Sequence, residues 1–214
     1  GQAPVPPRLA ALEAAADLPS IGYTETRLDP YLDGSWNRRL FWRKSAYFVT
    51  LDVFRAGRAG TFALESQWRL LGRAEITPDG FASTLEPSGA AARAGSTIVF
   101  RTAPLAEERG AASAWHVRRS AVDLSDDSAR RQYHRYAPPL LNRLRPAAVL
   151  ALGEGEKAGL ASLFYVTSPA RPRDYSLAAA GPGSFLILGD EPAWLGLPQD
   201  GSRTGRGPIE AEAG

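Results

Sequence analysis

Apolar and polar residues alternate between positions 47 and 77, and this alternation predicts two strands joined by a short loop. The second run extends from residue 61 to 77, far beyond the typical strand of about five or six residues. We expect Gly72 to mark a bulge or corner in it, and residues 56–60 to close a hairpin. The apolar positions that share one face are Tyr47, Val49, Leu51 and Val53, then Phe62, Leu64, Trp68, Leu70, Ala74 and Ile76.

Two aromatic residues, Phe48 and Phe54, lie on the otherwise polar face of the first strand. Large apolar side chains are more often covered than displayed, which favours a second layer packed on this face. The alternative is a surface that binds an apolar ligand. The predicted hairpin is therefore the core of the fold and also a candidate binding region.

Shorter apolar runs elsewhere predict further strands, and residues 147–167 predict a second hairpin around the loop 153–159. Three segments favour short helices instead. They are residues 8–16, which follow a proline, residues 126–136, which follow a capping serine, and residues 140–144. The other expected strands cover residues 21–28, 81–85, 97–102, 114–124 and 184–188.

These elements predict an α+β fold made mainly of antiparallel strands, because the strands do not alternate with long helices. We expect a curved sheet, a sandwich or a partly closed barrel with two or three short helices. The 214 residues suffice for one domain with a sizeable core. The expected organisation is an N-terminal tether over residues 1–7, a single β-rich globular domain over 8–198 and a flexible C-terminal tail over 199–214.

The composition, with 44% hydrophobic and 22% charged residues, is that of an ordinary soluble globular protein. A formal net charge of +2 is too small to indicate a nucleic-acid partner by itself. The absence of cysteine excludes structural disulfides and cysteine-ligated metals. No apolar run approaches the roughly 18 residues of a membrane span.

The first residues, Gly1 and Gln2 followed by the extended segment 3–7, are typical of a processed end. Removal of a signal peptide, or of a lipidated cysteine, would place the protein in the periplasm or at the outer membrane of a bacterial envelope. A lipid anchor is compatible with this interpretation. The alternative is an internal domain excised from a longer cytoplasmic chain.

Aromatic and basic residues are interleaved just before the first long strand. Exposed tryptophan beside arginine is common at surfaces that bind protein partners, although buried tryptophan at the end of a barrel would give the same pattern. We treat this segment and the two phenylalanines as a candidate site for a partner or ligand. The site residues are Trp36, Arg38, Arg39, Trp42, Arg43, Phe48 and Phe54.

The expected helix 126–136 carries the densest basic cluster of the chain. Its arginines could neutralise phosphate while its tyrosines stack on bases, which makes it a candidate anion or nucleic-acid site. An amphipathic surface helix whose arginines pair with local acids explains the pattern equally simply. The residues of this alternative site are Arg130, Arg131, Tyr133, His134 and Arg135.

No motif specifies catalysis, a metal or a cofactor, and none of these is predicted. The two histidines, His116 and His134, show no metal-ligand spacing. The loop 153–159 lacks the Gly-Lys-Ser/Thr ending of a phosphate loop, and no Gly-x-Ser-x-Gly sequence is present. A hydrolase with a dispersed active site stays open, because catalytic sets are defined by geometry.

The segment VTLDVFRAGRAGTFALESQWRL, residues 49–70, has a strand, a glycine-containing loop and then Leu-x-x-x-Trp-x-Leu. It resembles the paired strands of bacterial transport-auxiliary lipoproteins over about a tenth of the chain. The resemblance implies paired strands here, and no function or residue role is carried over from it.

The leading functional prediction is a non-enzymatic, envelope-associated accessory protein of bacteria. It would act through a protein partner in an envelope assembly or through an apolar ligand. The alternatives are a nucleic-acid or polyanion binder that uses residues 126–145, with nucleic acid the less favoured partner, and the dispersed hydrolase.

Overall fold

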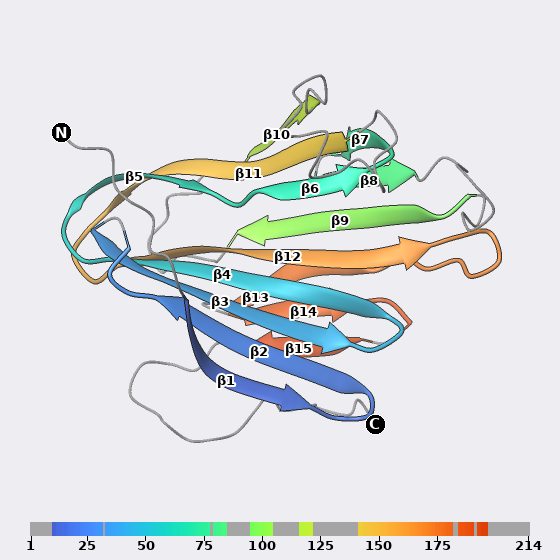
Figure 1. The fold of residues 1–214 in the computed structure, drawn as a ribbon, viewed down its shortest axis with the longest axis horizontal. Coiled ribbons are helices and arrows are strands. Elements are labelled where there is room, and N and C mark those ends of the chain that lie inside the picture. Colours follow the sequence, from blue (N-terminus) through green and yellow to red (C-terminus); the bar gives the residue numbers. More distant parts are fainter. Residues whose placement is uncertain are drawn as a thin grey trace.

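The computed structural model describes residues 10–31, 33–77, 79–84, 95–104, 116–121, 141–181, 184–190 and 192–196. Within these residues the regular elements are all strands, and no helix is present (Figure 1). The strands are β1 (Ala11–Asp17), β2 (Ile21–Leu28), β3 (Gly34–Arg43), β4 (Tyr47–Ala56), β5 (Gly60–Glu65), β6 (Trp68–Leu71), β7 (Arg73–Thr77), β8 (Gly80–Thr84), β9 (Thr97–Pro104), β10 (His116–Ala121), β11 (Leu141–Leu152), β12 (Lys157–Thr167), β13 (Ser176–Gly181), β14 (Ser184–Leu188) and β15 (Ala193–Gly196).

The strands form three open, antiparallel sheets. The central sheet has the order β1-β2-β3-β4-β12-β9-β8-β7. The arch sheet has the order β10-β11-β5, with β6 also paired to β11, and the small sheet has the order β13-β14-β15. The expected antiparallel β architecture is thus confirmed, whereas a partly closed barrel is not what these open sheets form.

The central sheet is covered on both faces at its middle strands, β4 and β12. One core cluster joins β4 and β12 to the small sheet, through residues such as Leu163 and Ile187, both fully buried. Two further clusters join the other face to the arch sheet, through residues such as Phe54 and Leu144. Figure 1 shows β13 to β15 lying behind β4 and β12. Coverage on both sides explains why β12 is buried at nearly every position.

The strands of the two expected hairpins are present, but they do not pair with each other as predicted. β4 pairs with β3 and β12, and β5 pairs with β11 in the other sheet. The paired strands that the lipoprotein resemblance implied are therefore not formed. Likewise β12 pairs with β4 and β9 rather than with β11. Both loops are arches that carry the chain from one sheet to the other.

The two arches lie side by side and bend one continuous antiparallel ribbon. The amide of Ala56 donates to the carbonyl of Glu156 over 2.9 Å, and the amide of Gly155 donates to the carbonyl of Ala56 over 2.8 Å. β4 and β12 form the ribbon before the bend, and β5 and β11 form it after the bend. Phe54, Leu64 and Leu150 are buried inside the bend. An alternating pattern is equally compatible with an arch and with a hairpin, because it specifies which face is buried and not which strand is the neighbour.

The expected long strand is three strands, β5, β6 and β7, and Gly72 is the predicted corner between β6 and β7. Its φ of 101° lies in the region that favours glycine. A Cβ atom here would stand 2.4 Å from the carbonyl oxygen of Thr84. The side-chain amide of Asn142 donates to the Gly72 carbonyl over 2.5 Å. After this corner Ile76 is 51% exposed, which corrects its assignment to the buried face.

Two expected helices are strands instead. Residues 8–16 overlap β1, an alanine-rich edge strand that pairs with β2, and residues 140–144 overlap the start of β11. Helix propensity is a weak preference even for alanine, the best helix former, and hydrogen bonding to a neighbouring strand overrides it. The expected helix 126–136, the tether 1–7 and the tail 199–214 lie outside the described residues.

Candidate functional site

A buried carboxylate, Asp52 of β4, lies at the centre of the aromatic and basic segment, where the central and arch sheets meet. It is 2% exposed. Arg38 donates to both of its oxygens, from Nε over 2.6 Å and from Nη2 over 2.9 Å. Trp36 Nε1 donates over 3.1 Å and Ser66 Oγ over 3.5 Å. A carboxylate that is removed from water needs hydrogen-bond donors in its place. These donors therefore allow Asp52 to be buried.

Arg38 connects this buried anion to the surface. Its side chain is 40% exposed, and Nη2 also donates to Ser66 Oγ over 3.3 Å. The guanidinium carbon lies 5.3 Å from the centroid of the Trp68 ring, which is a cation–π contact. The bidentate pair and the ring fix the orientation of the cation. Arg38 is therefore a positioned hydrogen-bond donor at the boundary between core and solvent.

Trp42 shares this face of β3 and is displayed to solvent, with 47% of its surface exposed. Gly22 lies opposite it in the ladder, and a Cβ there would stand 3.4 Å from Trp42 Cε3. The missing side chain gives the indole room. Lys44 Nζ lies 5.9 Å from the Trp42 ring centroid and also donates to Asp17 over 2.5 Å. An exposed indole with a flanking cation can stack on a flat, partly apolar ligand.

The remaining residues of the predicted patch lie on the opposite face of β3, because a strand alternates its side chains. Arg39 donates to Glu25 Oε1 over 3.0 Å and Asn37 donates to the same oxygen over 2.8 Å. Burial alone would raise the pKa of Glu25, but these donors outweigh it and lower the pKa. Burial together with Glu25 raises the pKa of Tyr23 to about 12. Arg43, partly exposed, belongs to this second face. The structure thus divides the predicted patch in two.

Phe54 lies buried between the central and arch sheets, and Phe48 lies partly buried at the same interface. Phe54 is 1% exposed, with its ring centroid 4.9 Å from that of Phe62. Phe48 stacks on Phe164 at 4.4 Å between centroids. The second-layer interpretation of these two residues is confirmed. Their proposed contact with an apolar ligand stays a prediction.

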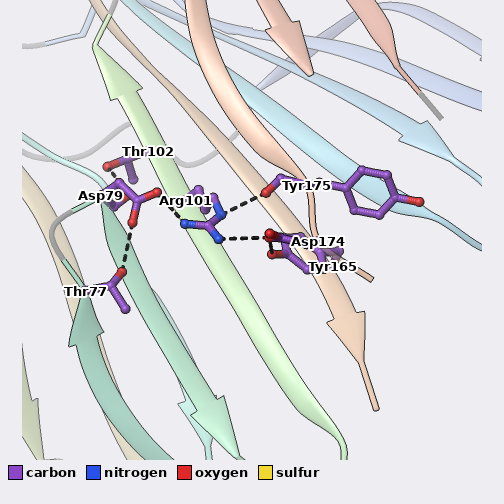
Figure 2. A network of polar contacts seen from close by, with 7 residues as sticks. All are labelled: Thr77, Asp79, Arg101, Thr102, Tyr165, Asp174 and Tyr175. Atoms are coloured by element: carbon purple, nitrogen blue, oxygen red, sulfur yellow. Dashed lines mark hydrogen bonds and ion pairs between the residues drawn. The ribbon is translucent and has the colours of Figure 1, made fainter. Parts of the chain in front are cut away.

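Sequence reasoning missed a second polar network, centred on Arg101 of β9 (Figure 2). Arg101 donates to Asp79 over 2.5 Å, to Asp174 over 3.1 Å and to the carbonyl of Tyr175 over 2.8 Å. Tyr165 also donates to Asp174 over 3.0 Å. Burial would raise the pKa of Asp79, but Arg101 outweighs it and lowers the pKa. The residues are too far apart in sequence for any local pattern to join them.

This network fastens the segment that leads into the small sheet. Asp79 follows β7, and its carbonyl accepts from the amide of Thr102 over 2.6 Å. Asp174 and Tyr175 immediately precede β13. Burial raises the pKa of Tyr165, so its hydroxyl stays protonated as a donor at neutral pH. The network joins four separate chain segments, and we interpret it as a contact that stabilises the fold.

The five residues of the alternative anion site, Arg130, Arg131, Tyr133, His134 and Arg135, lie outside the described residues. Within the described residues, no three histidine, aspartate or glutamate side chains are grouped to hold a metal ion. The same part of the chain contains no helix of the length and hydropathy that crossing a membrane requires.

Comparison with known proteins identifies structures that share the fold of this chain. No family model and no curated protein matches the chain. Among solved structures, a heparinase III superposes with a TM-score of 0.59 at 12% identity, over 87% of this chain and 27% of that chain. The heparan sulfate lyase HepC from Pedobacter heparinus superposes with a TM-score of 0.56 at 12% identity, over 88% of this chain and 28% of that chain.

The likeness covers most of this chain, which spans less than a third of the length of these enzymes. At such identity it shows a shared fold. It also corrects the predicted function, because the solved structures that superpose here include heparan sulfate lyases, which are polysaccharide-degrading enzymes. The expectation of a non-enzymatic accessory protein is wrong and is not carried further, and neither are its nucleic-acid and dispersed-hydrolase alternatives. The expected location in a bacterial envelope stays a prediction.

Proposed function

We propose that this chain is the β-sandwich module of an enzyme that degrades an acidic polysaccharide of the heparan sulfate type. The observation that carries the proposal is the superposition on heparan sulfate lyases over 87% to 88% of the chain. Because the chain spans only 27% to 28% of those enzymes, the proposal assigns it a part of such an activity.

The surface of β3 supports a role in holding sugar. Trp42 offers an exposed ring on which the apolar face of a pyranose can stack, as aromatic side chains commonly do in ligand sites. Arg38, held by Asp52, offers a fixed donor on the same face of the same strand. Four residues separate the two side chains, which corresponds to about 13 Å along a strand. A chain of two or three sugars can span that distance.

The test is an assay of the complete polypeptide that the gene encodes. A lyase breaks the glycosidic C–O bond by elimination: a proton leaves the carbon beside the carboxylate and its electron pair forms a C=C bond. The leaving oxygen takes up a proton. The unsaturated product absorbs ultraviolet light, so product release is followed directly. We expect release from heparan sulfate and none from dextran, a neutral polysaccharide without the acidic carbon.

Comparing two acidic polysaccharides shows whether the activity depends on sulfate as well as on carboxylate. Heparan sulfate carries both sulfate and carboxylate, whereas hyaluronan carries carboxylate alone. Activity on heparan sulfate with less on hyaluronan would support the proposal in full. Failure to shorten any acidic polysaccharide, with the polypeptide shown to be folded by circular dichroism, would refute it.

A further inference from the structure

Four arginines lie on the outer face of the arch sheet, on three adjacent strands. Arg69 of β6 stands directly opposite Arg143 of β11, and Arg118 of β10 stands directly opposite Arg145 of β11. Inward side chains of β11 alternate with these positions, and Leu144 between them is fully buried in the core. We call the set of Arg69, Arg118, Arg143 and Arg145 the arginine face.

Direct cross-strand pairing of like charges costs stability in an antiparallel sheet. The arginine face contains two such pairs, separated by two residues of β11, or about 7 Å along the strand. Neighbouring strands lie roughly 4.8 Å apart. Four guanidinium groups therefore occupy one compact patch, at a cost that an anion bound between them would offset.

Among the described strands of the arch sheet, one acidic residue lies at an outward position of this face. Glu65 is the acidic residue at an outward position of these strands, and its Oε2 lies 3.8 Å from Arg145 Nη1. The outward neighbours toward the arch are Thr61, Ala63, Val149 and Ala151, which are exposed and uncharged. The Nε atoms of Arg143 and Arg145 are buried and have no hydrogen-bond partner among the described residues. The Arg145 side chain as a whole is still 32% exposed, and guanidinium groups that reach solvent are suited to sulfate or carboxylate oxygens.

We propose that the arginine face binds sulfate and carboxylate groups of a linear acidic polysaccharide. This inference rests on the proposed function and gives it a binding surface, away from the β3 face that carries Trp42. The spacing of the two pairs along β11 corresponds to anionic groups repeated along an extended polymer. Guanidinium forks bind such groups bidentately, which lysine cannot do.

The same strands argue against nucleic acid as the occupant. Binding of single strands relies on aromatic side chains on which bases stack. Within the described part of the arch sheet, Phe62 and Trp68 pack inward against the core clusters. The outward positions with described side chains are aliphatic, hydroxyl or charged. Charge without stacking platforms suits a sulfated sugar chain.

The experiment measures binding of the 214-residue chain to a fluorescent heparan sulfate oligosaccharide by anisotropy, over a range of salt concentrations. The variants are Arg69→Gln/Arg143→Gln and Arg118→Gln/Arg145→Gln. The matched control, Arg55→Gln/Arg171→Gln, removes the same charge from exposed positions outside the arginine face. We expect each variant to weaken binding at least tenfold and the control less than twofold. The salt slope should fall by between one and two units, as about 0.7–0.9 per contact implies.

A conservative variant separates the role of the fork from that of charge. Arg69→Lys/Arg143→Lys should keep most of the salt dependence and still lose severalfold in affinity, and matched thermal melts confirm folding. Control and variants losing affinity equally would overturn the inference, because net charge alone would then explain binding. Tighter binding to single-stranded DNA than to heparan sulfate, lost in the same variants, would overturn the choice of ligand.

The two proposals can fail separately. Arginine variants that bind like the wild type, in a polypeptide that still depolymerises heparan sulfate, would remove only this surface. Arginine-dependent binding by a complete gene product that cleaves no acidic polysaccharide would remove only the enzymatic proposal.

Discussion

Strands β4 and β12 present two very different faces to their neighbours. Toward the small sheet, Val49, Leu163 and Ile187 form a core cluster without a charged member. Toward the arch sheet the same two strands bury polar groups among the aromatic rings, including Thr50, Asp52 and Ser162. Adjacent residues of one strand thus belong to an apolar interface and to a polar one.

This difference indicates where stability and function are separated in the fold. The apolar interface joins two layers mainly through burial, and the Arg101 network adds polar contacts at Tyr165 and Tyr175. The polar interface carries the Asp52–Arg38 pair to the surface of β3, next to the exposed Trp42. Buried ionic groups seldom add net stability, so the pair is better explained by the position it gives Arg38 than by the energy it contributes.

The largest effect is expected on the apolar side. Leu163→Ala removes a fully buried side chain from the cluster that joins the central and small sheets. We expect unfolding free energy to fall by about 3–5 kcal/mol, since a cavity adds to the lost transfer energy. Urea titration measures it. A loss below about 1 kcal/mol would mean that the small sheet is not packed on Leu163.

Arg38→Ala tests the polar side. It leaves Asp52 buried with only Trp36 and Ser66 as donors, and we expect a loss of about 3 kcal/mol in the same titration. Arg38 is partly exposed, so the value lies at the lower end of the range for buried pairs. The double variant Arg38→Ala/Asp52→Asn should recover part of the loss. If it recovers none, the unpaired charge is not the cause.

Asp79→Asn tests the polar contact that fastens the small sheet, through pH. Arg101 lowers the folded pKa of Asp79 below its ordinary value, so its contribution is complete above about pH 4–5 and disappears as pH falls through the folded pKa. Because Asp79 is 45% exposed, the contribution is less than about 1 kcal/mol. Wild type and variant should differ at pH 7 and converge near pH 2. A difference that grows on acidification would contradict the sign.

The smallest effect is expected for Thr50→Val/Ser162→Ala. The two hydroxyls are buried on neighbouring strands, and neither has a hydrogen-bond partner among the described residues. Removing unpaired hydroxyls should change unfolding free energy by less than about 0.5 kcal/mol, or raise it slightly. A loss above about 1.5 kcal/mol would show that these groups are hydrogen-bonded in solution.

The sequence predicts most strands of this fold and the corner at Gly72, because alternation and glycine act locally. It does not predict which strands pair. The loops after Ala56 and Leu152 are arches, and their identity depends on contacts between residues about 100 positions apart. Residues 8–16 form a strand for the same reason, since β2 provides the ladder.

The candidate site could be predicted only in part, because local patterns do not show which strands are neighbours. Trp36, Arg38 and Trp42 stand out as part of an aromatic and basic segment, but the alternation that separates them from Arg39 and Arg43 becomes visible only once the segment is known to be a strand. Asp52 reads as an ordinary polar position. The arginine face depends on the register of β11 with β6 and β10, which no local pattern contains.

The proposed activity is tested by the time course of unsaturated product release when the complete gene product is mixed with heparan sulfate or with dextran. We expect steady release from heparan sulfate and none from dextran. A folded polypeptide that leaves both polymers intact would contradict it.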